Sequence, residues 1–303
     1  MTAEASEAGK APATGVRLRS RVQTEGLWRG VFRRLLRNRG ALIGLALLAL
    51  MLLVALAADF AAPYEPNTIA PGSELQAPSG THLFGTDQFG RDILSRIMHG
   101  TRLSFQVGFI AVGIATVCGV TLGLVSGYYG RWVDALAMMW IDIMLAFPGI
   151  LLALAIGAVL GPSLLNLMIA VGISAVPSYT RLVRGAAPAT KQQQYIEAAR
   201  VVGVGDTAIM FKHILPNVLA PVIVLATLGI GGAILVGASL SFLGLGAKPP
   251  TPEWGAMLST GRNYLTLAPW ITLFPGLAIM LTVLSINMLG DGLRDALDPR
   301  LKR

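Results

Sequence analysis

The stretch EAARVVGVGDTAIMFKHILP, from Glu197 to Pro216, decides how this chain folds, because it is a polar segment between two strongly apolar halves. It contains acidic and basic side chains, yet it keeps a regular apolar face. Gly203 and Gly205 interrupt it, and Leu215-Pro216 is expected to end it. The pattern predicts a helix, a glycine turn and a second short helix. Between membrane spans, such a segment would be a rigid helical elbow outside the bilayer.

The composition is that of a membrane protein. Of 303 residues, 54% are hydrophobic and 13% are charged, whereas a soluble domain has about 25% charged residues. The net charge of +8 could indicate nucleic acid, but nine Lys and Arg residues precede residue 41 without regularly interleaved aromatic side chains. That placement is typical of the cytoplasmic flank of a first span. We therefore expect a lipid bilayer, and no nucleic acid, around this chain.

Six apolar segments are predicted to cross the membrane, and the first of them is just long enough for a hydrocarbon core about 30 Å thick. They cover residues 41–58, 103–128, 133–160, 164–179, 217–242 and 270–289. The predicted fold class is therefore an all-α membrane protein with six transmembrane helices. Between the first two spans, residues 85–102 are expected to form an amphipathic helix with ion pairs Asp87–Arg91 and Asp92–Arg96.

The distribution of basic residues predicts the orientation. Of the 24 Lys and Arg residues, 19 fall on the side that holds both termini and the central polar segment, and 5 fall on the other side. Because cytoplasmic loops carry the excess of Lys and Arg, both termini and the segment from Glu197 to Pro216 are predicted to be cytoplasmic.

Three regions follow from this layout. Residues 1–26 lack periodicity and are expected to form a disordered cytoplasmic tail. Residues 27–102 combine an amphipathic segment, the first transmembrane helix and a long extracytoplasmic loop. Residues 103–303 are expected to form a five-helix core, whose cytoplasmic loop covers about residues 180–216.

The usual motifs of catalysis do not occur in the sequence. It contains neither the glycine-rich phosphate loop G-x-x-x-x-G-K-[ST] nor the G-x-S-x-G or H-E-x-x-H motif. His82, His99 and His213 fall on two sides of the membrane and cannot share one metal ion. The single cysteine, Cys118, is expected to be a small core residue. We therefore predict a non-enzymatic chain that binds no metal and no cofactor itself.

Asp142 is the clearest ionisable residue within a span. It lies nine residues after Val133, which is about 13 Å along a helix. A carboxylate at that depth is expected to face the bundle interior, either as a pathway or gate residue or in a packing hydrogen bond to a Ser or Thr. Arg181, at the inner end of the fourth span, is a candidate ionic partner.

Small residues and prolines predict close packing and bends. Gly119, Gly123 and Gly127 recur every four residues, a ridge that allows two helix backbones to approach closely. The partner helix could belong to this chain or to a second subunit. Pro148 and Pro177 are expected to kink the third and fourth spans.

The central stretch resembles a known signature. Glu197-Ala198-Ala199, three residues, Gly203, nine residues, His213, one residue and Leu215-Pro216 are similar to the EAA signature of binding-protein-dependent ABC transporter permeases. That signature has Ile where this chain has His213, and a histidine there resembles the peptide-transport branch.

Further strings extend the resemblance to about residues 30–303. The string GTDQFGRD at 85–92 and the tail GDGLRDALDPR at 290–300 resemble the dipeptide/oligopeptide (Dpp/Opp) C-type permease subunits. So does the order of a basic segment, one span and a long outer loop before a five-span core.

The resemblance implies a type I ABC importer permease in a bacterial cell membrane. It implies a second homologous permease, two ABC ATPase subunits that use ATP and Mg, an extracytoplasmic solute-binding protein and a peptide substrate. It also assigns contact with the ATPase to the coupling segment, through Glu197, Ala198, Ala199, Gly203, His213, Leu215 and Pro216.

Two alternatives remain open from the sequence. The same architecture could import nickel chelates or glutathione. An ion-coupled secondary transporter is a more remote alternative, because it would require several buried carboxylates and an inverted repeat.

Overall fold

The computed structural model describes residues 27–297, which are almost entirely helical; the predicted tail, residues 1–26, lies outside them. The only bridge between extended residues in this range joins Thr86 and Asp92. The elements are α1 (Leu27–Leu35), α2 (Arg39–Ala61), α3 (Ile93–Tyr129), α4 (Arg131–Leu145), α5 (Gly149–Leu160), α6 (Leu164–Lys191), α7 (Gln194–Val201), α8 (Asp206–Ala208), the π-helical η1 (Ile209–Ile214), α9 (Leu215–Phe242), α10 (Trp254–Gly261), η2 (Arg262–Tyr264) and α11 (Trp270–Leu297).

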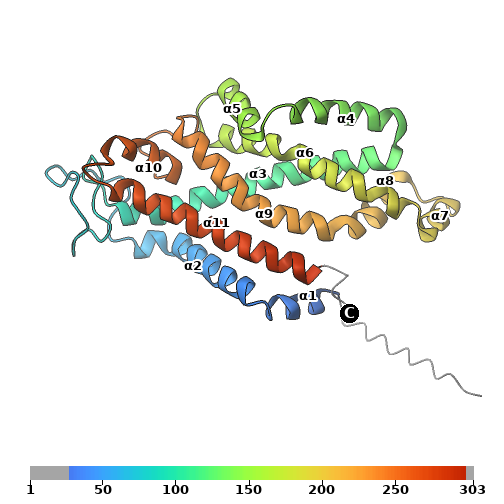
Figure 1. The fold of residues 1–303 in the computed structure, drawn as a ribbon, viewed down its shortest axis with the longest axis horizontal. Coiled ribbons are helices and arrows are strands. Elements are labelled where there is room, and N and C mark those ends of the chain that lie inside the picture. Colours follow the sequence, from blue (N-terminus) through green and yellow to red (C-terminus); the bar gives the residue numbers. More distant parts are fainter. Residues whose placement is uncertain (1–26, 298–303) are drawn as a thin grey trace, which may run out of the picture.

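The long helices run side by side along the molecule. Figure 1 shows residues 62–92 and α10 gathered at one end and α7 at the opposite end. The first and last helices that the structure describes place α1 and the last turn of α11 toward the same end as α7. A polar elbow at one end and long loops at the other are what a bundle crossing a membrane requires.

Four helical stretches are long and apolar enough to span a bilayer: α2, α3, residues 206–242 and α11. A fifth is the pair α4 and α5, if the two together make one span. The remaining predicted span, at residues 164–179, belongs to α6, which contains the polar residues Asn166, Tyr179 and Arg181 and is not among the helices that meet this criterion of length and hydropathy.

The third predicted span is broken rather than kinked. α4 and α5 meet at 91°, and Pro148 stands immediately before α5, where its fixed backbone dihedral suits the start of a helix. Pro177 lies inside α6 without ending it, and α6 continues to Lys191. The cytoplasmic loop predicted from residue 180 therefore begins as a helix.

The predicted amphipathic helix at 85–102 is wrong in its first half. α3 begins at Ile93 and runs unbroken through the predicted boundary at residue 102, whereas residues 85–92 form a turn with positive φ at Gly85 and Gly90. Asp87 does pair with Arg91, at 2.6 Å, but across this turn.

The predicted pair Asp92–Arg96 does not form. The Asp92 carboxylate accepts hydrogen bonds from the Ser95 N–H and hydroxyl, both at 2.8 Å, and so caps α3. Its other oxygen lies 3.0 Å from His82 Nδ1. Arg96 instead donates to the carbonyl oxygens of Pro66, at 2.8 Å, and Pro250, at 3.3 Å.

α3 and α6 form the centre of the bundle. The glycine ridge of α3 faces α6: a Cβ atom added at Gly119 would lie 2.5 Å from Tyr179 Cβ, and one at Gly123 would lie 2.7 Å from the Thr180 carbonyl oxygen. Gly127 faces Ala187 in the same way, at 2.8 Å. The ridge therefore packs within this chain.

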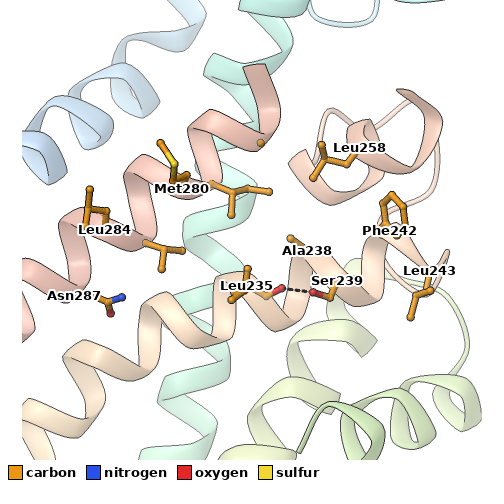
Figure 2. A pocket seen from close by; sticks show the side chains of 12 residues that line it. Leu235, Ala238, Ser239, Phe242, Leu243, Leu258, Met280, Leu284 and Asn287 are labelled. Atoms are coloured by element: carbon orange, nitrogen blue, oxygen red, sulfur yellow. Dashed lines mark hydrogen bonds between the residues drawn. The ribbon is translucent and has the colours of Figure 1, made fainter. Parts of the chain in front are cut away.

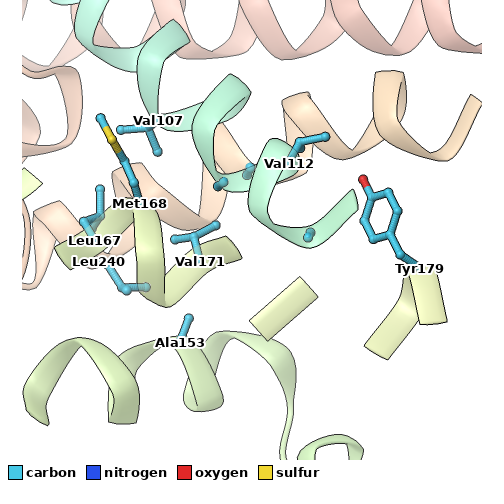
Figure 3. Close-up of a cluster of buried hydrophobic side chains, with 11 residues drawn as sticks. Val107, Val112, Ala153, Leu167, Met168, Val171, Tyr179 and Leu240 are labelled. Atoms are coloured by element: carbon cyan, nitrogen blue, oxygen red, sulfur yellow. The ribbon is translucent and has the colours of Figure 1, made fainter. Parts of the chain in front are cut away.

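A buried apolar core surrounds this contact (Figure 3). It contains side chains of three helices: Val107 and Val112 of α3, Leu167 and Val171 of α6, and Leu240 of α9. Cys118 is not part of a core, because its side chain is exposed on the surface of α3. In a membrane protein an apolar neighbourhood does not distinguish the interior from the lipid-facing surface.

The ridge gives a stability prediction. Gly123→Ala should destabilise the protein by about 1–3 kcal/mol, because the added methyl group meets the α6 backbone. The matched variant is Gly113→Ala on the same helix, where a Cβ meets no atom within 4 Å. Thermal unfolding of both purified variants in detergent measures the difference. An equal melting temperature for the two would contradict the close α3–α6 contact.

Candidate functional site

The elbow consists of α7, the turn at 202–205, α8 and η1, residues 194–214 in all. Ile196 of α7 is fully buried, while the neighbouring Glu197 and Ala198 are exposed and Ala199 is half-buried. The same helix therefore has one side fixed to the bundle and one side free. Val201 and Val202 extend the free side, with 88% and 83% of their surface exposed.

Gly203 makes the turn that ends α7. Its φ of +87° lies in the left-handed region, which side chains with a Cβ atom disfavour. The Gly203 and Val204 N–H groups donate back to the carbonyl oxygens of Arg200, at 2.9 Å, and Ala199, at 3.0 Å. These bonds satisfy the last carbonyl groups of the helix and fix the direction in which the chain leaves it.

Buried aliphatic side chains attach the elbow to the bundle. Ile209, Met210 and Ile214 are buried against α3 and α6. The complete buried cluster also contains Val120, Leu124, Tyr128, Val183, Ala187, Ile196, Val218 and Val222. This cluster therefore joins the elbow to α3, α6 and α9.

Polar contacts complete the attachment. The Tyr128 hydroxyl, at the end of α3, donates to Asp206 at 2.6 Å. The guanidinium of Arg200 lies 5.3 Å from the centre of the same ring, within the range of a cation–π contact. Asn217 donates to both the Tyr195 hydroxyl, at 3.1 Å, and the His213 carbonyl, at 2.7 Å, and so ties α7 to the start of α9.

Leu215-Pro216 follows the elbow directly but does not end the helix, contrary to the prediction. Pro216 stands in the first turn of α9, and residues 206–242 form one helical stretch with a π-helical section at 209–214. A proline is tolerated there because the first N–H groups of a helix need no partner within it. Leu215 is half-buried and Pro216 is exposed, while the half-buried His213 lies 6.5 Å from Tyr195, ring to ring.

The sequence missed several residues of the elbow. The contacts of Tyr128, Asp206 and Asn217 join positions far apart along the chain, so no local pattern indicates them. The exposure of Val201 and Val202 could have been suspected, since two valines directly precede the glycine turn.

A second group of functional candidates lies between α4 and α6. Arg181 donates to Asp142 at 2.6 Å, so the carboxylate pairs with an arginine and not with the Ser or Thr that a packing role would use. Both side chains are more than half exposed, at 55% and 62%. A second ion pair lies nearer the start of α4, where Asp134 accepts two hydrogen bonds from Arg184, at 2.9 and 2.6 Å.

An apolar hollow of about 740 Å³ lies between α9, α10 and α11. Figure 2 shows Leu235, Met280 and Leu284 along it, with Asn287 at one end and the Ser239 hydroxyl bonded to the Leu235 carbonyl. It offers no charged group, so it is suited to apolar packing and not to ion recognition. No group of three potential metal ligands occurs within residues 27–297.

The geometry therefore defines a helical membrane subunit with a fixed elbow beyond one end of the bundle. Residues 119–303 match the family described as "Binding-protein-dependent transport system inner membrane component". Residues 26–78 match the "N-terminal TM domain of oligopeptide transport permease C".

Curated relatives cover nearly the whole chain. The chain is 54% identical to the dipeptide transport system permease protein DppC of Alkalihalophilus pseudofirmus over 91% of this chain and 90% of the relative. It is 46% identical to the glutathione transport system permease protein GsiD of Pectobacterium atrosepticum over 91% and 92%. The chain belongs to the binding-protein-dependent ABC transporter permeases.

Solved structures agree on the fold. Inward-facing structures of the MetNI methionine ABC transporter cover 67% of this chain and 96% of their own, with a TM-score of 0.53 and 18% identity. At that identity the likeness shows the fold alone, which is that of an ABC importer permease. The protein is a multi-pass component of the bacterial plasma membrane.

The elbow gives a prediction about Gly203. Gly203→Ala places a Cβ on a residue at φ +87°, so we expect the end of α7 to loosen. Gly205→Ala is the matched control, since Gly205 has φ −65° and open space around it. Hydrogen exchange of residues 194–208 should accelerate severalfold in the first variant only. Equal exchange in both variants would show that the turn does not hold the elbow.

Proposed function

We propose that this chain is the permease subunit of an ATP-driven importer for dipeptides or oligopeptides. The observation that carries this proposal is the elbow: an exposed apolar tip on a helix whose opposite side is buried in the bundle. Such an element fits a cleft on a partner and transmits movement of that partner to the membrane helices. The 54% identity to a dipeptide permease supports the cargo class.

In this proposal the contact with the ATPase is made by the coupling segment. Glu197 and Ala198 are exposed on α7, and Gly203 sets the turn that presents Val201 and Val202. His213, near the end of η1, accepts from Asn217 through its carbonyl group, and Leu215 and Pro216 begin α9, so these three residues have a positioning role. ATP and Mg are bound by two partner ATPase subunits.

The remaining parts of the proposal concern topology and partners. We infer six membrane crossings, with α6 as the crossing whose polar groups face protein or water, and both termini in the cytoplasm. A second homologous permease would complete the pathway, and an extracytoplasmic solute-binding protein would deliver cargo to the loops at 62–92 and 243–269. The excess of Lys and Arg on the elbow side supports this orientation.

Asp142 and Arg181 are proposed as pathway or gate residues. Their side chains are exposed within a helical bundle of predominantly apolar surface. A charge pair facing lipid would be costly, so the face between α4 and α6 is better suited to water or protein.

Glutathione is the second candidate cargo, because the chain is also 46–48% identical to glutathione permeases. Nickel chelates remain an alternative within the same architecture. Calorimetry on the cognate binding protein with dipeptides, glutathione and a nickel chelate would decide between them. Heat of binding with dipeptides alone supports the proposed cargo, and binding of either alternative alone would replace it.

The proposed contact gives a prediction on complex formation. Glu197→Lys or Val202→Glu should strongly reduce the amount of ATPase that co-purifies with the tagged permease, because each places an unfavourable charge on the exposed side of α7 or on the turn that follows it. Membrane insertion should be unchanged.

The control is Glu65→Lys, the same charge reversal on an exposed residue at the opposite end. It should retain the ATPase, measured as the ratio of ATPase to permease on a stained gel. Undiminished ATPase in both α7 variants would exclude the elbow as the contact.

A further inference from the structure

α6 carries a polar stripe along one face of a helix within the bundle. Ser174, Ser178, Arg181 and Arg184 are spaced by four, three and three residues, a spacing that places side chains above one another on a helix. The last three are exposed and Ser174 is half-buried. The stripe therefore extends from the middle of α6 toward the elbow.

α4 presents a matching face. Asp134, Met138 and Asp142 recur every four residues, and the two carboxylates pair with Arg184 and Arg181. A hollow of about 440 Å³ is lined by Met138, Asp142, Arg181 and Arg184. Its volume is within the range of about 300–1,000 Å³ that small-molecule sites occupy.

The two ion pairs differ in how completely they are satisfied. Asp134 accepts two hydrogen bonds from Arg184 and a third from the Ser126 hydroxyl, and it does not line the hollow. Asp142 accepts one hydrogen bond from a side chain in the described part of the chain, from Arg181. Its exposed fraction is 62%, against 21% for Asp134. The pair Asp142–Arg181 is therefore the one that can open at small cost.

We propose that this hollow is a transient binding site for the two termini of a zwitterionic peptide. The peptide ammonium group binds Asp142 and the peptide carboxylate binds Arg181, so each partner of the ion pair exchanges its counter-charge. One ion pair is thus replaced by two. No charge is left unpaired, and this matters because an unpaired charge away from water is costly. This inference rests on the proposed peptide cargo and names the residues that would contact it.

The site is suited to passage rather than storage. Exposed ion pairs contribute little free energy, so exchange of Asp142–Arg181 for two peptide contacts yields weak binding. A cargo held that loosely can leave again, which a transport pathway requires.

The test measures access to the hollow directly. The permease carries two substitutions: Cys118→Ala removes the native thiol, and Ser178→Cys places a reporter thiol one helical turn from Arg181. The transporter complex with this permease is purified without cargo. The rate of labelling by a charged, water-soluble thiol reagent is followed with increasing dialanine, without ATP or binding protein. Met138→Cys serves as a second reporter, from the α4 side, if the first variant does not assemble.

Dialanine should slow the labelling by the factor 1 + [L]/Kd, about threefold at twice its Kd. N-acetyl-dialanine amide, which has neither terminal charge, should give no protection. Protection should be lost in Asp142→Asn and Arg181→Gln. It should be retained in Asp134→Asn, which breaks the other α4–α6 ion pair at a carboxylate that does not line the hollow.

Three results would overturn the proposal. A reporter cysteine that the reagent does not reach would mean that the stripe faces no water. Equal protection by the capped peptide would mean that termini are not recognised, and loss of protection in Asp134→Asn would assign the effect to the placement of α4. Co-purification of the ATPase tests the proposed function independently, because the labelling needs no ATP hydrolysis.

Discussion

The close packing of α3 against α6 is the contact on which the rest of this structure depends. Gly119, Gly123 and Gly127 remove the side chains that would separate the two helices, and buried residues of both helices then hold Ile196 and Ile209 of the elbow. Lipid tails are as apolar as the core, so the association depends on close van der Waals contact and hydrogen bonds. The glycine ridge thus fixes the position of the elbow as well as the fold of the bundle.

The opposite end of the bundle is fixed by charge. Asp87 and Arg91 are both buried, and Arg96 is buried beside them. Removing such groups from water is costly unless every one has partners. Here Arg91 pairs with Asp87, and Arg96 donates to the main-chain carbonyl groups of Pro66 and Pro250, so the network joins the long outer loop to the loop before α10. The two ends therefore use different forces: aliphatic packing for the elbow and a satisfied ionic network for the loops.

The sequence predicted the class of the fold because composition and helical period act locally. Local reasoning gave the wrong conformation where one sequence pattern is compatible with two conformations. Leu215-Pro216 fits the end of one helix and the first turn of the next equally well, and Asp87–Arg91 can pair in a helix or across a glycine turn. Cys118 was misplaced because apolar neighbours occur on both the inner and the lipid-facing side of a membrane helix.

Among the functional residues, the sequence again predicted only those that a local pattern indicates. The spacing from Glu197 to Pro216 indicated the elbow, and Arg181 was the nearest candidate for Asp142, which it does contact. The anchors Tyr128 and Asp206 lie 78 positions apart, and only the packed structure brings them together. The 91° angle between α4 and α5 was likewise out of reach, since Pro148 permits a break but the packing around α5 sets its angle.

The structure also indicates where movement of the elbow can enter the membrane. Residues 206–242 form one helical stretch of 37 residues, about 55 Å long at 1.5 Å per residue, so a push at Asp206 is carried directly into α9. An irregular section within this stretch is the π-helical turn at 209–214, and such turns are frequent at functional sites. Ile209, Met210 and Ile214 of this turn are buried, which keeps it attached to α3 and α6 while its backbone adjusts. A movement of Asp206 therefore reaches α9 through a π-helical section whose side chains stay in the core.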